Sequence, residues 1–254
     1  MKQVNSDLIH FMGVPIDVIP MGKLNCRIAD MMDSESRPQV MACANPHSLA
    51  VSKSNNEFYW ALNNAEVVIA DGAGVCLFAS KLKKVKVERI TGADFFMSTM
   101  SILEKRAGKV FFFGSSERVL EIIRKKLEKE YENIQLVGMI SPPFGEWSKE
   151  SDMQFIEQIN SAKPDVLWVG MTAPKQEVWV NNNKDALDVP LIGNIGAVFD
   201  FYAGTYNRAP AWMCKRNLEW AYRLFKEPRR MWRRNFISTP LFIKEVLVEH
   251  FRGN

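Results

Sequence analysis

The stretch KVFFFGSSERVLEIIRKKLEKEYENIQLVGMI, residues 109–140, decides the fold that we predict. It begins with a continuous apolar run at 109–113, passes through a helical pattern at 117–130 and ends in a second apolar run at 134–140. Continuous hydrophobicity indicates strands that are buried on both faces. The helix between them supplies the crossover that two parallel strands require. The stretch therefore predicts a strand, helix and strand unit of a parallel sheet.

The same alternation extends along most of the chain. Further strand-like runs lie at 39–44, 66–70, 165–169 and 189–192, and further helical patterns lie at 94–106, 149–161 and 175–183. This order is typical of a doubly wound α/β fold, so we expect a Rossmann-like sheet of mostly parallel strands flanked by helices. In such folds, ligands bind in the crevice at the carboxyl ends of the strands.

The composition is that of an ordinary globular protein, with 47% hydrophobic and 24% charged residues. It excludes a disordered or collagen-like chain. The net charge of +4 is unevenly divided, because residues 208–254 hold 11 Lys and Arg against 4 Asp and Glu, a net +7, which leaves −3 for residues 1–207. We therefore expect two parts, an α/β core at 1–206 and a basic, aromatic-rich helical appendage at 207–254.

Several classes of protein are not favoured. No uncharged run reaches the roughly 18–20 residues that a membrane-spanning helix needs, and the first residues lack the apolar segment of a secretory signal. We therefore expect a cytoplasmic protein. The 4 cysteines lie far apart and only 3 histidines are present, so we expect reduced thiols and no zinc site. We expect no cofactor.

Polar residues and glycines follow several of the predicted strands. Asp71 ends one strand and opens a Gly-x-Gly turn, where its carboxylate could act as a general base or cap the next helix. The turn fails as a dinucleotide-binding fingerprint because Leu77 stands where a third glycine is needed. Gly114 opens another turn, which could hold an anion at the N-terminus of the following helix.

Three more residues have both a functional and a structural interpretation. Arg89 precedes a helix and could meet a phosphate or lie on the surface. Gln176 could donate and accept hydrogen bonds towards sugar hydroxyls or a phosphate, whereas Lys175 and Glu177 beside it are of types that are usually solvated. Asp200, between two phenylalanines, could bind a ribose or cap a loop.

The appendage combines cations with aromatic rings. Such a pattern suits an anionic membrane surface, a phosphate group or a nucleic acid. The residues concerned are Arg223, Arg229, Arg230, Arg233 and Arg234 with Trp220, Tyr222, Phe225 and Trp232.

Seven short motifs follow one another over most of the chain. They are Asn45-Pro46, Ala70-Asp71-Gly72-Ala73-Gly74, Arg89-Ile-Thr-Gly-Ala-Asp94, Pro174-Lys175-Gln176-Glu177, Gly196-Ala197-Val198-Phe199-Asp200, Arg208-Ala209-Pro210 and Leu218-Glu219-Trp220 through Arg223 to Glu227-Pro228. Together they resemble the WecG/TagA/CpsF family of glycosyltransferases. The resemblance implies an inverting, metal-independent enzyme that moves a sugar from a UDP-sugar to an undecaprenyl-diphosphate-linked saccharide in cell-surface polysaccharide synthesis. The sugar would be N-acetylmannosamine, its uronic acid or glucose.

The resemblance also implies roles for individual residues. It makes Asp71 the catalytic base and places Arg89 and Gln176 beside it in the active site. Cys43 stands where the family commonly has a threonine, so this candidate substrate contact has a thiol in place of the hydroxyl. Asn45 is implied to contact the substrate, and Asp200 and the region of Phe144 are implied to contact the nucleotide. Arg223, Arg230 and Arg233 are implied to contact the diphosphate. The anion site suggested at Gly114 is a further candidate for substrate binding.

The implied partners are the UDP-sugar, the lipid-linked acceptor and the inner face of the cell membrane, with self-association through the appendage and no nucleic acid. Two other classes stay open on the sequence alone. One is a nucleotide-dependent oxidoreductase on the same kind of sheet. The other is a nucleic-acid-binding protein that uses the basic appendage.

Overall fold

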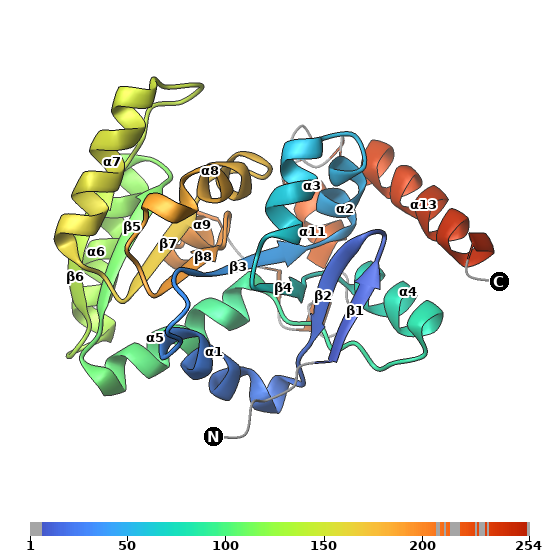
Figure 1. Ribbon diagram of the computed structural model, residues 1–254, viewed down its shortest axis with the longest axis horizontal. Helices are drawn as coiled ribbons and strands as arrows, with labels where there is room; N and C mark the ends of the chain where they lie inside the picture. The colour runs from blue at the N-terminus through green and yellow to red at the C-terminus, as the bar shows by residue number, and fades with distance from the viewer. Residues whose placement is uncertain are drawn as a thin grey trace.

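The computed structural model describes residues 7–206, 209–210, 212–213, 219–226, 228, 232 and 234–252. Its central sheet has six parallel strands in the order β4-β3-β8-β7-β5-β6, with helices on both faces (Figure 1). The strands are β3 (Gln39–Ala44), β4 (Val67–Ala70), β5 (Lys109–Gly114), β6 (Gln135–Ile140), β7 (Val166–Gly170) and β8 (Leu191–Asn194). The predicted fold class is confirmed, and each predicted strand and helix is found with its ends within two residues.

The helices around the sheet alternate with its strands along the chain. They are α1 (Leu24–Met32), α2 (Pro46–Ser52), α3 (Asn56–Asn63), α4 (Ala73–Lys83), α5 (Gly92–Arg106), α6 (Glu117–Glu130), α7 (Lys149–Ala162), α8 (Lys175–Asn183) and α9 (Val198–Ala203). Towards the C-terminus lie α11 (Glu219–Lys226), a π-helical turn (Arg234–Ser238) and α13 (Thr239–Arg252).

Alternate residues of each strand face opposite sides of the sheet, as strand geometry requires. In β4, Val67 and Ile69 join the hydrophobic cluster under α1, α5, α6 and α9, whereas Val68 and Ala70 join the cluster under α2, α3 and α4. Both faces are therefore apolar. This explains why the strands appear in the sequence as continuous hydrophobic runs.

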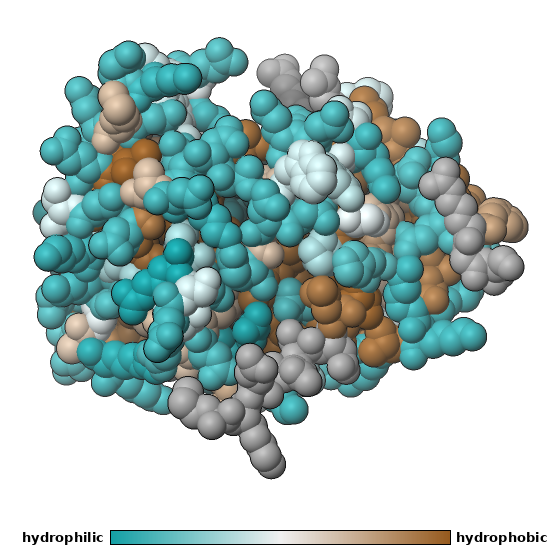
Figure 2. Space-filling view, viewed as in Figure 1, coloured by the Kyte–Doolittle hydropathy of each residue, from teal (hydrophilic) through white to brown (hydrophobic). Residues whose placement is uncertain are grey.

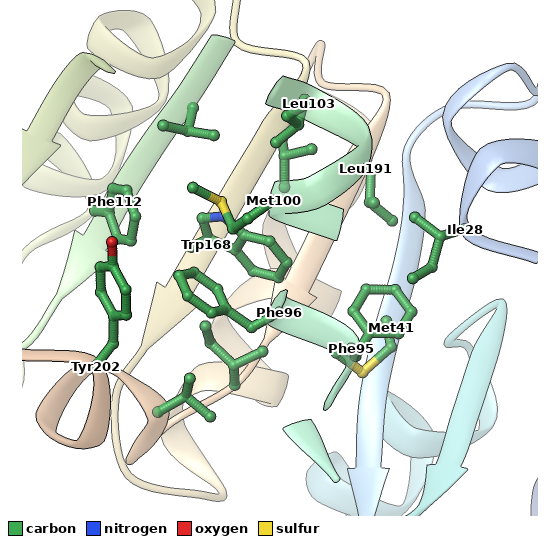
Figure 3. Packing of buried hydrophobic residues seen from close by; sticks show 14 of the residues in the cluster. Ile28, Met41, Phe95, Phe96, Met100, Leu103, Phe112, Trp168, Leu191 and Tyr202 are labelled. Carbon is green, nitrogen blue, oxygen red and sulfur yellow. The ribbon is translucent and has the colours of Figure 1, made fainter. Parts of the chain in front are cut away.

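The larger cluster is built around α5 (Figure 3). The ring of Phe96 lies 5.0 Å from that of Trp168 and 5.1 Å from that of Tyr202, measured between centroids. Both Phe96 and Trp168 are almost completely buried. Burial of one such side chain contributes about 1.5–3 kcal/mol, so this cluster fixes α5 and the segment before it on the sheet.

A two-stranded antiparallel hairpin, β1 (Asp7–Phe11) and β2 (Val14–Val18), precedes the sheet and was not predicted. Its turn residues Met12 and Gly13 both have positive φ, 54° and 77°, as the favoured hairpin turns require. The side chain of Asp17 accepts a hydrogen bond of 2.9 Å from the backbone nitrogen of Val68. The hairpin thereby covers the outer edge of β4, which would otherwise present unpaired amides.

The last helix, α13, packs into the cluster that the hairpin shares with α2 and α4. Phe242 and Val246 are 2% and 4% exposed, and Glu249 accepts a hydrogen bond of 2.6 Å from the backbone nitrogen of Met12. Glu249 also forms an ion pair of 2.5 Å with Lys83. The division at residue 206 stays a prediction, but α13 contributes directly to the packing of the α/β core.

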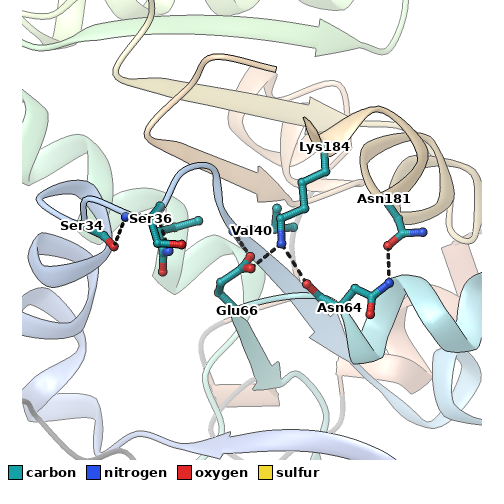
Figure 4. Close-up of polar contacts among 8 residues, drawn as sticks. Ser34, Ser36, Val40, Asn64, Glu66, Asn181 and Lys184 are labelled. Atoms are coloured by element: carbon teal, nitrogen blue, oxygen red, sulfur yellow. Dashed lines mark hydrogen bonds and ion pairs between the residues drawn. The ribbon is translucent and has the colours of Figure 1, made fainter. Parts of the chain in front are cut away.

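A polar network at the amino ends of the strands holds α8 in place (Figure 4). Glu66 accepts a hydrogen bond of 2.8 Å from the backbone nitrogen of Val40 and also pairs with Lys184, which follows α8. Asn64 donates a hydrogen bond of 2.9 Å to Asn181 within α8. These contacts fix the C-terminal end of α8, so the opposite end is held over the carboxyl edge of the sheet.

Candidate active site

The candidate site lies at the carboxyl ends of β4, β3, β8 and β7. The connection from β3 leads to β4 on one side, whereas β5, β6 and β7 lie on the other side of β8. The sheet therefore changes winding direction beside β3 and β8, which is where ligands bind in open α/β sheets. Each of these four strands is followed by residues that the sequence analysis singled out.

Asp71 follows β4 directly and is half-buried. Its backbone nitrogen donates a hydrogen bond of 2.9 Å to the carbonyl oxygen of Ala44, at the end of β3. The N-cap residue of α4 is Gly72, which has no side chain to accept from the helix amides. Asp71 therefore does not occupy the N-cap position of α4.

The Gly-x-Gly turn after Asp71 brings α4 against α2. Gly72 has φ +145°, and a Cβ atom there would lie 3.0 Å from the ring of Pro46. A Cβ atom at Gly74 would lie 3.2 Å from the same ring and 3.6 Å from Phe242 of α13. The two glycines allow this close approach of helices, which is a structural reason for the motif.

Arg89 lies alongside Asp71, because the backbone nitrogen of Ile90 donates a hydrogen bond of 3.2 Å to the carbonyl oxygen of Ala70. The pKa of the Cys76 thiol is raised to about 11, chiefly by burial. The positive charge of Arg89 acts to lower this pKa, and the negative charge of Asp71 acts to raise it. Both charges are thus close to one thiol. Arg89 is half-buried, whereas the alternative interpretation placed it on the surface.

The helix after Arg89 has its own cap. Thr91 accepts a hydrogen bond of 3.1 Å from the backbone nitrogen of Asp94, and Asp94 accepts one of 2.9 Å from the backbone nitrogen of Thr91. This reciprocal pair satisfies the first amides of α5. Arg89 is therefore not needed for the helix start.

Cys43, near the end of β3, and Asn45, which follows β3, are the predicted site residues of this strand. Burial, together with the negative charges of Asp71 and Glu177, raises the pKa of the Cys43 thiol well above its usual value. The thiol is therefore protonated, and it donates to the carbonyl oxygen of Asn194 at 3.7 Å. Two carboxylates from different elements are thus close to Cys43.

Asn45 is the N-cap of α2. Its side-chain oxygen accepts hydrogen bonds of 3.0 Å from the backbone nitrogens of both His47 and Ser48, while the Ser48 hydroxyl accepts one of 2.7 Å from the nitrogen of Asn45. The oxygen is occupied by this capping box. Only the amide nitrogen of Asn45 is left to donate to a substrate.

Gln176 and Glu177 begin α8, after β7, and are 4% and 3% exposed. The expectation that Glu177 would be solvated is wrong, because the first turn of α8 points into the protein and not away from it. Gln176 accepts a hydrogen bond of 3.1 Å from the backbone nitrogen of Met171 and donates one of 2.8 Å to Glu177. Glu177 is a buried acid of the site that sequence reasoning missed.

The remaining predicted residues lie on other elements. Gly114 ends β5, and a Cβ atom there would lie 2.5 Å from the carbonyl oxygen of Gly170, so strand packing already requires a glycine. Phe144 lies between β6 and α7 and is 94% exposed. Asp200, in the first turn of α9, accepts a hydrogen bond of 3.3 Å from the hydroxyl of Thr205. Arg223 lies on α11, while Arg230 and Arg233 lie outside the described residues.

Asn194 is a second buried polar residue that the sequence analysis did not single out. It ends β8 and is 1% exposed, and its side-chain oxygen has no hydrogen-bond partner within the described part of the chain. In the same described ranges, no three or more His, Cys, Asp or Glu side chains are grouped so that they could hold a metal ion. No helix there is both long and apolar enough to cross a membrane.

Comparison with known proteins gives a consistent family. The family model described as "Glycosyl transferase WecG/TagA/CpsF family" matches residues 9–254. A Bacillus subtilis (strain 168) protein named N-acetylglucosaminyldiphosphoundecaprenol N-acetyl-beta-D-mannosaminyltransferase is 28% identical over 210 residues, 83% of this chain and 79% of the relative. A Staphylococcus aureus (strain MW2) protein with the same name is 27% identical over 249 residues, 96% of this chain and 94% of the relative.

The match spans nearly the whole chain, including all the elements that form the candidate site. It decides between the three classes that the sequence analysis left open, in favour of sugar transfer. The chain belongs to the WecG/TagA/CpsF family and is a glycosyltransferase.

Proposed function

We propose that the protein transfers N-acetylmannosamine from a UDP-sugar to a saccharide linked to undecaprenyl diphosphate, with inversion at the anomeric carbon and without a metal ion. The observation that carries the proposal is the position of Asp71 beside Arg89 at the carboxyl edge of the sheet. The relatives' names support the acceptor and the sugar. The uronic acid of N-acetylmannosamine and glucose are the alternative donor sugars.

In this mechanism Asp71 is the general base. A hydroxyl oxygen of the acceptor attacks the anomeric carbon of the donor as the bond from that carbon to the UDP oxygen breaks. The carboxylate of Asp71 takes the hydroxyl proton, which makes the attacking oxygen a better nucleophile. Attack opposite the leaving UDP inverts the configuration of the carbon.

The departing UDP carries negative charge that must be stabilised. Arg89 is the described cation of the site, and a guanidinium can bind two phosphate oxygens at once. We assign the same role to Arg223, Arg230 and Arg233 of the appendage. Electrostatic stabilisation of this kind is commonly the largest contribution to catalysis, so the cations take the place that a metal ion has in other sugar-nucleotide enzymes.

The appendage also supplies the contact with the membrane. Several of its described apolar side chains are exposed, and apolar side chains are visible where α13 lies in Figure 2. Three of them, Ile243, Leu247 and Phe251, lie four residues apart along one side of α13. This spacing suits insertion between lipid headgroups. The exposed residues are Trp220, Phe225, Trp232, Phe236, Ile237, Leu241, Ile243, Leu247 and Phe251.

The test is an assay of the purified protein with a panel of UDP-sugars and a polyprenyl-diphosphate-linked N-acetylglucosamine acceptor, measured by UDP release. We expect turnover with UDP-N-acetylmannosamine and a product whose new bond is β, as determined by NMR. Turnover with none of the panel would contradict the proposal. Binding to anionic vesicles that persists after Leu247→Ser and Phe251→Ser together would contradict the membrane role of α13.

A further inference from the structure

The buried carboxylate of Glu177 has a chemical role that its neighbour reveals. Burial of a charged group costs several kcal/mol unless hydrogen bonds compensate for it. Glu177 is 3% exposed and accepts a hydrogen bond of 2.8 Å from the side-chain nitrogen of Gln176. The carboxylate is thus placed to control how the Gln176 carboxamide is turned.

The orientation of that carboxamide follows from the chemistry of its two neighbours. The backbone nitrogen of Met171 can only donate, so it must face the oxygen of Gln176, and the distance is 3.1 Å. The nearer oxygen of Glu177 accepts at 2.8 Å, so it faces the nitrogen of Gln176. A flipped Gln176 side chain would lose both bonds, so its orientation is determined by Met171 and Glu177.

A third element lies beside the side chain. Gly196, in the loop after β8, has φ +52°, and a Cβ atom there would lie 3.5 Å from the oxygen and 3.6 Å from the nitrogen of Gln176. The carboxamide therefore lies between the end of β7, the loop after β8 and the start of α8.

One hydrogen of the Gln176 amide is left over. The described residues offer no second acceptor for the nitrogen, and the oxygen already has the Met171 nitrogen as its donor. In this orientation Gln176 presents a donor and not an acceptor. It therefore suits an oxygen of a ligand, such as a phosphate or sugar oxygen.

We propose that Glu177 is a positioning residue, which holds Gln176 so that its remaining N–H donates to an oxygen of the nucleotide-sugar donor. The inference rests on the proposed function, because it needs a UDP-sugar in the site. The proposal also predicts whether removal of the Glu177 carboxylate strengthens or weakens UDP binding. Loss of a negative charge near a diphosphate should strengthen UDP binding, whereas loss of the positioning of Gln176 should weaken it.

The experiment compares Gln176→Ala, Glu177→Ala and the double variant, with UDP binding measured by calorimetry and kcat/KM measured for the donor. We expect each single change to reduce kcat/KM by about tenfold, the effect of one hydrogen bond to a charged ligand. We expect the double variant to lose no more than Gln176→Ala alone. Additive losses, or tighter UDP binding by Glu177→Ala, would overturn the inference.

Two further variants separate positioning from stability. Glu177→Gln keeps an acceptor oxygen for Gln176, so we expect it to recover most of the activity that Glu177→Ala loses. The exchange of both residues, Gln176→Glu with Glu177→Gln, keeps the charge and allows both buried hydrogen bonds but removes the donor. We expect it to melt near the wild-type temperature and to bind the donor at least about tenfold more weakly.

An exchange variant that binds the donor normally would refute the role of Gln176 as a donor. If the exchange variant binds UDP itself more weakly, the oxygen that Gln176 contacts belongs to the diphosphate. If it binds UDP normally but binds the complete UDP-sugar more weakly, that oxygen belongs to the sugar. Both results support the inference. Wild-type protein that neither binds UDP nor turns over would instead refute the proposed function.

Discussion

Replacement of Phe242 by alanine should destabilise the whole protein, although this residue lies only 12 positions from the C-terminus. Phe242 is 2% exposed, and its ring lies 6.2 Å from that of Phe11 and 5.9 Å from that of Phe78, edge to face in both pairs. A buried Phe→Ala change costs about 3–5 kcal/mol. Because two aromatic pairs are lost as well, we place the cost at the middle of that range and not at its lower end, about 4 kcal/mol.

The assay is urea unfolding followed by circular dichroism, together with thermal melting. A loss of about 4 kcal/mol corresponds to a fall of about 8–16 °C in Tm for a chain of this size. Phe251→Ala is the matched control, because Phe251 lies on the same helix but is 74% exposed, and we expect a change within about 0.5 kcal/mol. Equal small effects of the two changes would refute the argument that α13 belongs to the core.

Three further predictions concern glycine packing, thiol reactivity and metal ions. Gly114→Ala should lower the free energy of unfolding in urea by about 3 kcal/mol, because its Cβ would meet the backbone of Gly170 at a φ of +127°. Gly145→Ala, where the Cβ would lie in open space, should lower it by about 1 kcal/mol. Equal losses for the two variants would contradict this reasoning. Iodoacetamide at pH 8 should modify the exposed Cys26 before Cys43, because the raised pKa of Cys43 keeps its thiol protonated. Mass spectrometry that finds Cys43 modified first would argue against the raised pKa. Transferase activity should persist in EDTA, and a strict need for Mg²⁺ or Mn²⁺ would exclude the metal-free mechanism.

The strands of the sheet were predictable because both of their faces are buried. A run such as Val110 to Phe113 has no polar residue to suggest anything else, and its neighbours in sequence supply the crossover helices. The β1–β2 hairpin escaped prediction for the opposite reason. Its strands are short, one contains Pro15 and the buried Asp17, and the Met12-Gly13 turn is not one of the common hairpin sequences.

The internal bonds of the candidate site could not be predicted from the sequence. Asp71 and Arg89 both lie near the Cys76 thiol, and Gln176 follows a strand that ends at the same edge of the sheet, because the carboxyl ends of parallel strands share one edge. Their roles in the site stay predictions. The cap at Asn45 could have been found, since Asn45, Pro46 and Ser48 form the signature of a capped helix start. The burial of Glu177 could not have been predicted, because it depends on which side of α8 faces the sheet. The insertion of Phe242 into the core could not have been predicted either, because it depends on contacts between distant segments.

The most direct test of the account compares Asp71→Asn with wild-type protein in the UDP-release assay with UDP-N-acetylmannosamine and the lipid-linked acceptor. Asp33→Asn, an exposed aspartate paired with Arg106, is the control for the loss of a surface charge. We expect Asp71→Asn to lower kcat by about 10²–10⁴-fold with UDP affinity little changed, and the control to leave turnover intact. An Asp71→Asn variant with wild-type kcat would contradict the account.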